Sequence, residues 1–164
     1  HGFNSLCGNT LEEADTPTFI GVRQSEFDSE LTVSVSGTAQ EAGVTFYMDE
    51  QQHYDLFRSV TTEGIKAVLR FHVGDAIMIA GEYEFEGAAD AEQQAVQLKA
   101  VTREEYYEFY VIDGAKEVFL GRAQAKYLSS EVAGGFTGVV MGLYAVDEQE
   151  NWAEFRNFYW KQGR

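Results

Sequence analysis

The chain is predicted to be an all-β protein built as a two-sheet antiparallel β-sandwich. Three observations predict this class: apolar residues recur at every second position over most of the chain, glycine turns separate these short runs, and no apolar stripe recurs at helical spacing. A period of two places one face of each strand in a core. With 164 residues, the chain is long enough for one domain with two layers.

The strand runs are separated by turn residues. They span residues 31–37, 44–48, 65–71, 96–100, 107–111 and 139–145, and residues 153–160 add an aromatic-rich strand near the end of the chain. Asp113-Gly114 follows the fifth run and is typical of a hairpin turn. Residues 88–94 allow one helical turn at most.

The domain organisation expected from these runs is simple. We expect residues 1–16 to be an N-terminal tail or interdomain segment, because they lack alternation, and residues 17–164 to be the β-sandwich domain. No run approaches the roughly 18 apolar residues of a membrane span, and no signal-peptide pattern is found. Because the chain starts at His1-Gly2 without a methionine, we expect a processed or cloned fragment.

The charge excludes one class of partner. The net charge is −15, from 27 acidic and 12 basic residues. Such a surface repels phosphate backbones but is indifferent to neutral sugars, so no nucleic-acid partner is expected. Cys7 is the single cysteine, which rules out an internal disulfide and permits a reducing compartment. The single cysteine of the chain slightly favours a cytoplasmic location over a secreted one.

No catalytic residues are predicted. Glycosidases need two carboxylates across the scissile bond, and the chain offers the adjacent or alternating pairs Glu12-Glu13, Glu84-Glu86 and Glu104-Glu105. A chain this acidic contains such pairs by chance, and none specifies a catalytic dyad. There is also no Gly-x-Ser-x-Gly elbow, phosphate loop or dinucleotide fingerprint, so no cofactor is expected.

No metal site is predicted either. The histidines His1, His53 and His72 do not stand at the spacings of known ligand sets. His1-Gly2 is similar to the copper-binding start of lytic polysaccharide monooxygenases. That family also uses a second internal histidine and usually disulfides, so a purification-tag remnant is the favoured interpretation.

The candidate binding site is a glycine-rich loop, Gly134-Gly135-Phe136-Thr137-Gly138. Small neighbours cannot cover the large ring of Phe136, and glycines allow a loop to approach another surface closely. Aromatic rings can stack on the apolar C–H faces of sugars. Phe136, with Gly135 and Thr137 beside it, is therefore the favoured candidate for a contact with sugar.

Several segments, in the same order, resemble the C-terminal domain of family 43 glycoside hydrolases, the β-xylosidase and α-L-arabinofuranosidase group. The first three are an opening strand at residues 19–27, a strand with Glu-Ala-Gly-Val at residues 41–47, and an acidic turn followed by His-Tyr-Asp at residues 49–55. The last two are residues 127–131, which lead into the Gly-Gly-Phe-Thr-Gly loop, and the final strand at residues 153–160. The resemblance covers residues 19 to 160. Residues 79–95 fit it poorly and receive no role.

The resemblance implies a concanavalin A-like jelly roll that follows a catalytic β-propeller. In that family a loop phenylalanine, at the position of Phe136 here, closes one side of the sugar pocket. The expected function is thus a non-catalytic domain that buttresses the propeller of a glycosidase acting on xylo- or arabino-oligosaccharides, and is inactive alone. The alternatives are an independent carbohydrate-binding module or lectin-like protein, and a purely structural or interaction domain without sugar contact.

Overall fold

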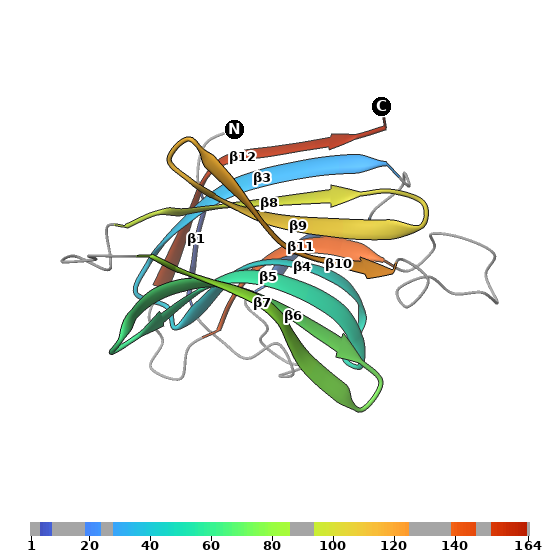
Figure 1. Ribbon diagram of the computed structural model, residues 1–164, viewed down its shortest axis with the longest axis horizontal. Helices are drawn as coiled ribbons and strands as arrows, with labels where there is room; N and C mark the ends of the chain where they lie inside the picture. Colours follow the sequence, from blue (N-terminus) through green and yellow to red (C-terminus); the bar gives the residue numbers. More distant parts are fainter. Residues whose placement is uncertain are drawn as a thin grey trace.

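The protein folds into two antiparallel β-sheets that pack face to face, as the computed structural model shows (Figure 1). The structure describes residues 4–7, 19–23, 28–85, 94–124, 139–146 and 152–163. All the regular secondary structure in this part of the chain consists of β-strands. None of these described residues forms a helix long and apolar enough to cross a membrane. The predicted all-β, two-sheet antiparallel sandwich is confirmed.

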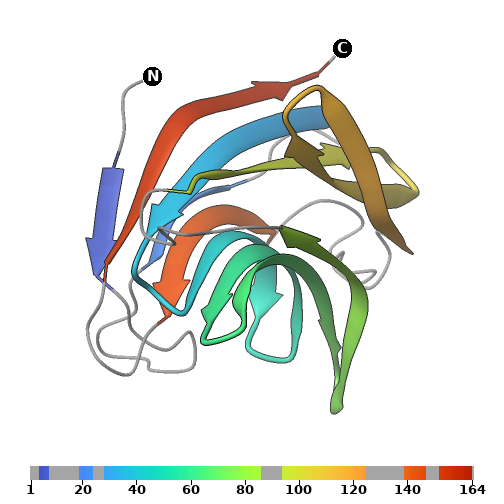
Figure 2. The ribbon, with the colours of Figure 1, turned by 60° about the vertical axis from the view of Figure 1, so that its left-hand side comes forward.

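The two sheets form curved layers, one above the other (Figure 2). Sheet A has the strand order β1-β12-β3-β8-β9-β10, and sheet B has the order β2-β11-β4-β5-β6-β7. The strands of sheet A are β1 (Asn4–Cys7), β12 (Trp152–Gln162), β3 (Ser29–Gly37), β8 (Val96–Thr102), β9 (Tyr106–Asp113) and β10 (Lys116–Gln124). The strands of sheet B are β2 (Phe19–Arg23), β11 (Val140–Val146), β4 (Glu41–Asp49), β5 (Gln52–Thr61), β6 (Gly64–Val73) and β7 (Ala76–Phe85).

The runs predicted from alternation correspond to seven of these strands: β3, β4, β6, β8, β9, β11 and β12. The hairpin predicted at Asp113-Gly114 joins β9 to β10, and Gly114 has the positive φ of 63° that such a turn requires. The possible helical turn over residues 88–94 lies, apart from Gln94, outside the described residues. The short strand β1 pairs with β12, and the division of the chain at residue 16 stays a prediction.

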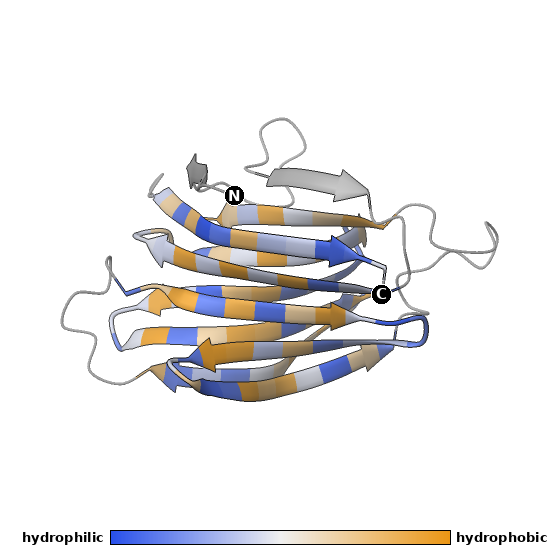
Figure 3. Ribbon diagram, turned by 90° about the horizontal axis from the view of Figure 1, so that it is seen from above, coloured by the Kyte–Doolittle hydropathy of each residue, from blue (hydrophilic) through white to orange (hydrophobic). Residues whose placement is uncertain are grey.

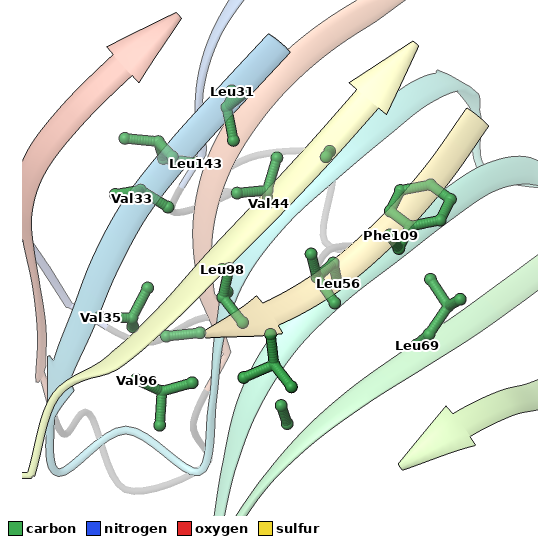
Figure 4. Close-up of a cluster of buried hydrophobic side chains, with 14 of the residues drawn as sticks. Leu31, Val33, Val35, Val44, Leu56, Leu69, Val96, Leu98, Phe109 and Leu143 are labelled. Carbon is green, nitrogen blue, oxygen red and sulfur yellow. The ribbon is translucent and has the colours of Figure 1, made fainter. Parts of the chain in front are cut away.

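The core lies between the two sheets. Hydrophilic and hydrophobic residues alternate along many of the strands (Figure 3), and the inward side chains of both sheets meet in one cluster (Figure 4). Val33 and Leu98 of sheet A and Leu56 of sheet B are fully buried in it. Phe46 meets Tyr107 edge to face at 5.0 Å between ring centroids, which is a favourable aromatic geometry.

Arg58 is a charged residue inside this sandwich, with 1% of its surface exposed. It comes from β5 of sheet B. Its Nε donates to the carbonyl oxygen of Gln94 at 3.1 Å, and its Nη1 donates to that of Gly37 at 2.9 Å. Burial lowers the pKa of Arg58 to about 10, so the guanidinium remains charged at neutral pH. The side chain therefore links sheet B to the end of β3 and the chain before β8.

The outer face of sheet A is a solvated surface of ion pairs. Lys99 lies 2.6 Å from Glu117 and Arg122 lies 2.7 Å from Glu108, and the side chains of Glu117 and Arg122 are about half exposed. Exposed pairs of this kind contribute little to stability. They give sheet A an outer face that is suited to water, in contrast to the outer face of sheet B.

Candidate functional site

The predicted pocket contacts Gly135, Phe136 and Thr137 lie outside the residues that the structure describes. The structure does describe the chain on both sides of them. Strand β10 ends at Gln124, and Val139 comes directly before β11. The positions of these two residues show where the segment 125–138 is attached to the sandwich.

Gln124 is held by a residue from the opposite sheet. The hydroxyl of Tyr54 in β5 donates to the carbonyl oxygen of Gln124 at 2.6 Å. Both residues line a hollow of about 430 Å³ between sheet B and the end of β10. Phe71, Met78 and Ala123 also line the hollow, so its wall is mainly apolar.

The segment returns to the sandwich at the same end. Val140 begins a row of residues that lie directly opposite one another across sheet B; we call this the end row, and it comprises Val140, Tyr47, His53, His72 and Ile77. The ring centroids of Tyr47 and His53 are 5.4 Å apart, and those of His53 and His72 are 4.7 Å apart. The sequence neighbours of His72 and Ile77 line the hollow beside Gln124.

The outer face of sheet B carries a buried ionic network next to the end row. Arg70 donates from Nε and Nη2 to Asp55 Oδ2, at 3.0 and 2.8 Å, and from Nη1 and Nη2 to the two oxygens of Glu41, at 3.0 and 2.7 Å. Thr45 and His53 contact the other oxygen of Asp55, each at 2.7 Å. The strand register explains the network, because Thr45, Asp55 and Arg70 stand opposite one another on β4, β5 and β6.

The network sets the ionisation of its members. Burial alone would raise the pKa of Asp55, but the hydrogen bond and charge of His53 and the charge of Arg70 outweigh burial and hold that pKa below its ordinary value. Burial, followed by the charge of Glu41, raises the pKa of Tyr144 well above its usual range. The Tyr144 hydroxyl donates to Glu41 Oε2 at 2.7 Å. Each carboxylate of the network thus has several donors.

This network does not form a catalytic site. Asp55 orients His53 as in a general-base pair, but His53 is only 3% exposed, and a substrate cannot reach it in this state. The four donors that reach Asp55 leave its carboxylate fully engaged. Among the carboxylate pairs noted in the sequence, Glu84, Glu104 and Glu105 are exposed, and the other members lie outside the described residues.

The described part of the chain contains no group of three or more metal-ligating side chains. His53 and His72 are neighbours, but His53 already contacts Asp55 through Nδ1. His1 lies outside the described residues.

Sequence reasoning missed this network, although part of its signal was present. The motif His53-Tyr54-Asp55 was noted only for its resemblance. In β5, polar His53 and Asp55 occupy the positions that face away from the core, where they are nonetheless buried, at 3% and 0% exposure. Their partners Glu41 and Arg70 stand on neighbouring strands, so the network depends on strand register and could not be found within one segment.

The architecture defines a class of protein. Two curved antiparallel sheets with a shared core form a concanavalin A-like sandwich. The family model described as the β-xylosidase C-terminal concanavalin A-like domain matches residues 6–161. The chain belongs to this family, so the predicted membership of the C-terminal domains of family 43 glycosidases and the predicted concanavalin A-like fold are confirmed.

Individual relatives agree with this assignment. The chain is 30% identical, over 135 residues, to the non-reducing end α-L-arabinofuranosidase BoGH43B of Bacteroides ovatus. The solved structure described as Bacteroides ovatus xyloglucan PUL GH43B has a TM-score of 0.82 at 27% identity and 97% coverage of this chain. The xylan β-1,4-xylosidase structure from Bacillus halodurans has a TM-score of 0.81 at 22% identity and 96% coverage, which supports the fold alone.

The relatives are much longer than this chain. It spans 25% of the curated arabinofuranosidase and 32% of each of the two solved structures. The similarity therefore describes one domain of these glycosidases.

Proposed function

We propose that this chain is the non-catalytic C-terminal domain of a family 43 glycosidase, where it buttresses a catalytic β-propeller and helps close its sugar pocket. The observation that carries the proposal is the family match over residues 6–161, combined with a span of only a quarter to a third of each relative. The relatives' names include an α-L-arabinofuranosidase and a xylan β-1,4-xylosidase, which favours xylo- or arabino-oligosaccharides as the substrate class.

The pocket-closing role is proposed for Phe136, with Gly135 and Thr137 beside it. The position of Phe136 in the Gly-Gly-Phe-Thr-Gly motif supports this role by resemblance. Gln124 and Val140, near the two ends of its segment, lie at one end of the sandwich, as a loop that reaches a neighbouring domain requires. An aromatic ring at the pocket wall would exclude water and pack on the apolar face of a sugar.

The test compares Phe136→Ala in the isolated chain and in the full-length parent enzyme. A pocket-closing ring contacts substrate, so kcat/KM on aryl xylosides or arabinosides is expected to fall about tenfold or more in the parent, which corresponds to about 1.4 kcal/mol. The isolated chain should lose little stability, whereas truncation of a core phenylalanine costs about 3–5 kcal/mol.

Phe119→Ala is a matched control, since Phe119 is 52% exposed on sheet A. This substitution is expected to leave kcat/KM of the parent enzyme unchanged. A large stability loss for Phe136→Ala with unchanged kinetics in the parent would remove Phe136 from the proposed function.

A second candidate is an independent carbohydrate-binding module on the same fold. One observation favours it: a structure of a functionally unknown protein from Saccharomyces cerevisiae has a TM-score of 0.70, and this chain covers 89% of it at 12% identity. The fold therefore also occurs as nearly a whole protein. Calorimetric titration with xylo-oligosaccharides decides between the two, because a Kd tighter than about 100 μM, roughly 5–6 kcal/mol, would favour the independent module.

A further inference from the structure

Strand β7 begins with a run of exposed large apolar side chains. Ile77, Met78 and Ile79 are 63%, 56% and 51% exposed. The other exposed large hydrophobic residues of the described chain are Phe119 on β10 and Trp152 and Tyr159 on β12, both strands of sheet A. We call Ile77, Met78 and Ile79 the apolar run of β7. Contiguous exposed apolar groups of this kind mark interaction surfaces.

The apolar run of β7 presents side chains on both faces of sheet B. Ile77 and Ile79 stand opposite His72 and Arg70 and share their outer face, whereas Met78 stands opposite Phe71 and lines the hollow. β7 is the edge strand of the sheet, and the turn joining it to β6 lies at the margin of the molecule, away from sheet A (Figures 1 and 2). A strand that faces only water is not expected to carry large apolar side chains on both faces, and exposed edge strands usually carry charged residues.

The surfaces beside the apolar run are also poorly suited to water. On the inner side, the hollow of about 430 Å³ has a mainly apolar wall. On the outer side, the ionic network satisfies Asp55 and Glu41 internally, and His53 is almost fully buried. The outer face of sheet A, in contrast, carries half-exposed ion pairs.

We propose that the apolar run of β7, with the adjoining hollow and end row, is the surface on which the catalytic domain of the same parent protein docks. This inference rests on the proposed function. The hollow contains both Gln124 and Met78, so the attachment at the end of β10 lies beside the apolar run. Val140, near the other attachment, lies at the same end of sheet B, at the opposite end of the end row from Ile77. If that segment reaches the sugar pocket of the catalytic domain, that domain lies at this end of the sandwich.

The length of the relatives also favours a catalytic domain of the same parent protein as the partner of this surface. Two thirds or more of each of these relatives lies outside the region that matches this chain, so a larger neighbouring domain is covalently available. The docking partner should present an apolar patch, because the centre of a stable interface excludes charged residues. Interdomain contacts of this kind hold domains in a fixed relative position when they are apolar.

Oxidation of Met78 in the full-length parent tests the surface. Hydrogen peroxide oxidises methionine thioethers according to their exposure, and peptide mass spectrometry reads each site separately. Docking predicts that Met78 is oxidised about tenfold more slowly in the native parent than in the urea-unfolded parent. Met141, which is 2% exposed within the sandwich core, provides the internal reference for a fully protected thioether. Oxidation of native Met78 at nearly the unfolded rate would overturn the inference.

Paired variants identify the contact. Ile77→Ser combined with Ile79→Ser in the parent is expected to restore rapid oxidation of Met78, while Tyr159→Ser, which changes an equally exposed residue of sheet A, is expected to leave Met78 protected. The slow oxidation of Met141 in every variant shows that the sandwich remains folded. Protection of Met78 that survives the double serine variant would contradict docking at this surface.

The outcomes also separate this inference from the proposed function. Loss of kcat/KM in Phe136→Ala with freely oxidised Met78 retains the pocket-closing role and overturns the docking surface. Protected Met78 with unchanged kinetics in Phe136→Ala retains the docking surface and overturns the pocket-closing role. Protection that disappears on dilution of the parent would assign the surface to a second copy and overturn the inference.

Discussion

Tyr54 of β5 donates its hydroxyl to the carbonyl oxygen of Gln124, at 2.6 Å, across the space between the two sheets. Tyr54 is 1% exposed, and its ring belongs to the core through Phe71 and Tyr107. The bond ends at the last residue of β10, where the segment with Phe136 leaves the sandwich. A core residue thus fixes the attachment point of the proposed pocket-closing loop.

Removing this hydroxyl should weaken the sandwich measurably. Tyr54→Phe keeps the ring and deletes one part-buried hydrogen bond, so the free energy of unfolding should fall by about 1–2 kcal/mol in urea titration. Tyr83→Phe is the control, because the Tyr83 hydroxyl bonds Asp113 at an exposed site and its loss should cost about 0.5 kcal/mol or less. Equal losses in the two variants would show that the Tyr54 bond has no special weight.

Asp55 should make stability depend on acid pH. Its pKa is lower in the folded protein than the ordinary value of 3.8, so between the two values the unfolded chain binds more protons. The stabilisation is therefore present above about pH 4 and is lost as the pH falls through the folded pKa. Asp55→Asn removes this titration and leaves Arg70 with one carboxylate partner, which should cost about 3–5 kcal/mol at pH 7.

The measurement is urea unfolding of both proteins from pH 7 to pH 3. The gap between wild type and Asp55→Asn should narrow below about pH 4. Glu84→Gln, at an exposed carboxylate of β7, should change stability by less than about 0.5 kcal/mol throughout. A gap that stays constant across the whole range would argue against a contribution from the ionised Asp55.

Any substitution of Arg58 that removes its two separate N–H donors should lower the stability of the protein. Arg58→Lys keeps the positive charge but cannot reach the carbonyls of Gly37 and Gln94 with two separate N–H groups, so about 1–3 kcal/mol should be lost. For a domain of this size, that loss lowers Tm by roughly 2–10 °C in calorimetry. Arg156→Lys, at a side chain that is 60% exposed, should leave Tm nearly unchanged. An unchanged Tm for Arg58→Lys would mean that water replaces the lost donors.

The isolated chain should not hydrolyse aryl xylosides or arabinosides. The sequence specifies no catalytic carboxylate pair, and the family to which the chain belongs is a C-terminal domain of glycosidases. The assay follows release of the aryl group by purified chain. Turnover that survives purification and disappears on one Asp or Glu substitution within the chain would contradict this expectation.

Alternation predicted strands with one buried face, such as β3 and β8, and also β4 and β11, which are buried on both faces. In β3 and β8 every second residue is buried, as a period of two requires. Strands β5 and β7 were missed for different reasons. In β5 the alternation is broken, because charged Arg58 is buried on the inner face and apolar Phe57 is buried on the outer face, whereas the start of β7 is exposed on both faces. In β10, a register shift between Phe119 and Gly121 breaks the period.

The candidate site was predictable only in part. Phe136 could be proposed because an aromatic residue among glycines stands out within one segment, and its role stays a prediction. The apolar run of β7 was not found, because Ile77, Met78 and Ile79 look like a buried strand until the sheet order places β7 at an edge. Register and sheet order arise from pairing between distant segments, which a pattern within one segment does not encode.

Strand β12 follows all the other strands in the chain, yet it lies inside sheet A, between β1 and β3. Leu31 of β3 pairs with Trp160, and Asn4 of β1 pairs with Phe155, so sheet A joins segments from opposite ends of the sequence. Sheets with such distant pairings fold slowly, over roughly milliseconds to seconds, because loop closure precedes any stabilising contact. During synthesis, the edge of β3 that pairs with β12 stays unpaired until β12 has been made. Sheet A is therefore completed only after β12 has been synthesised, and chaperones have time to bind the unfinished sheet.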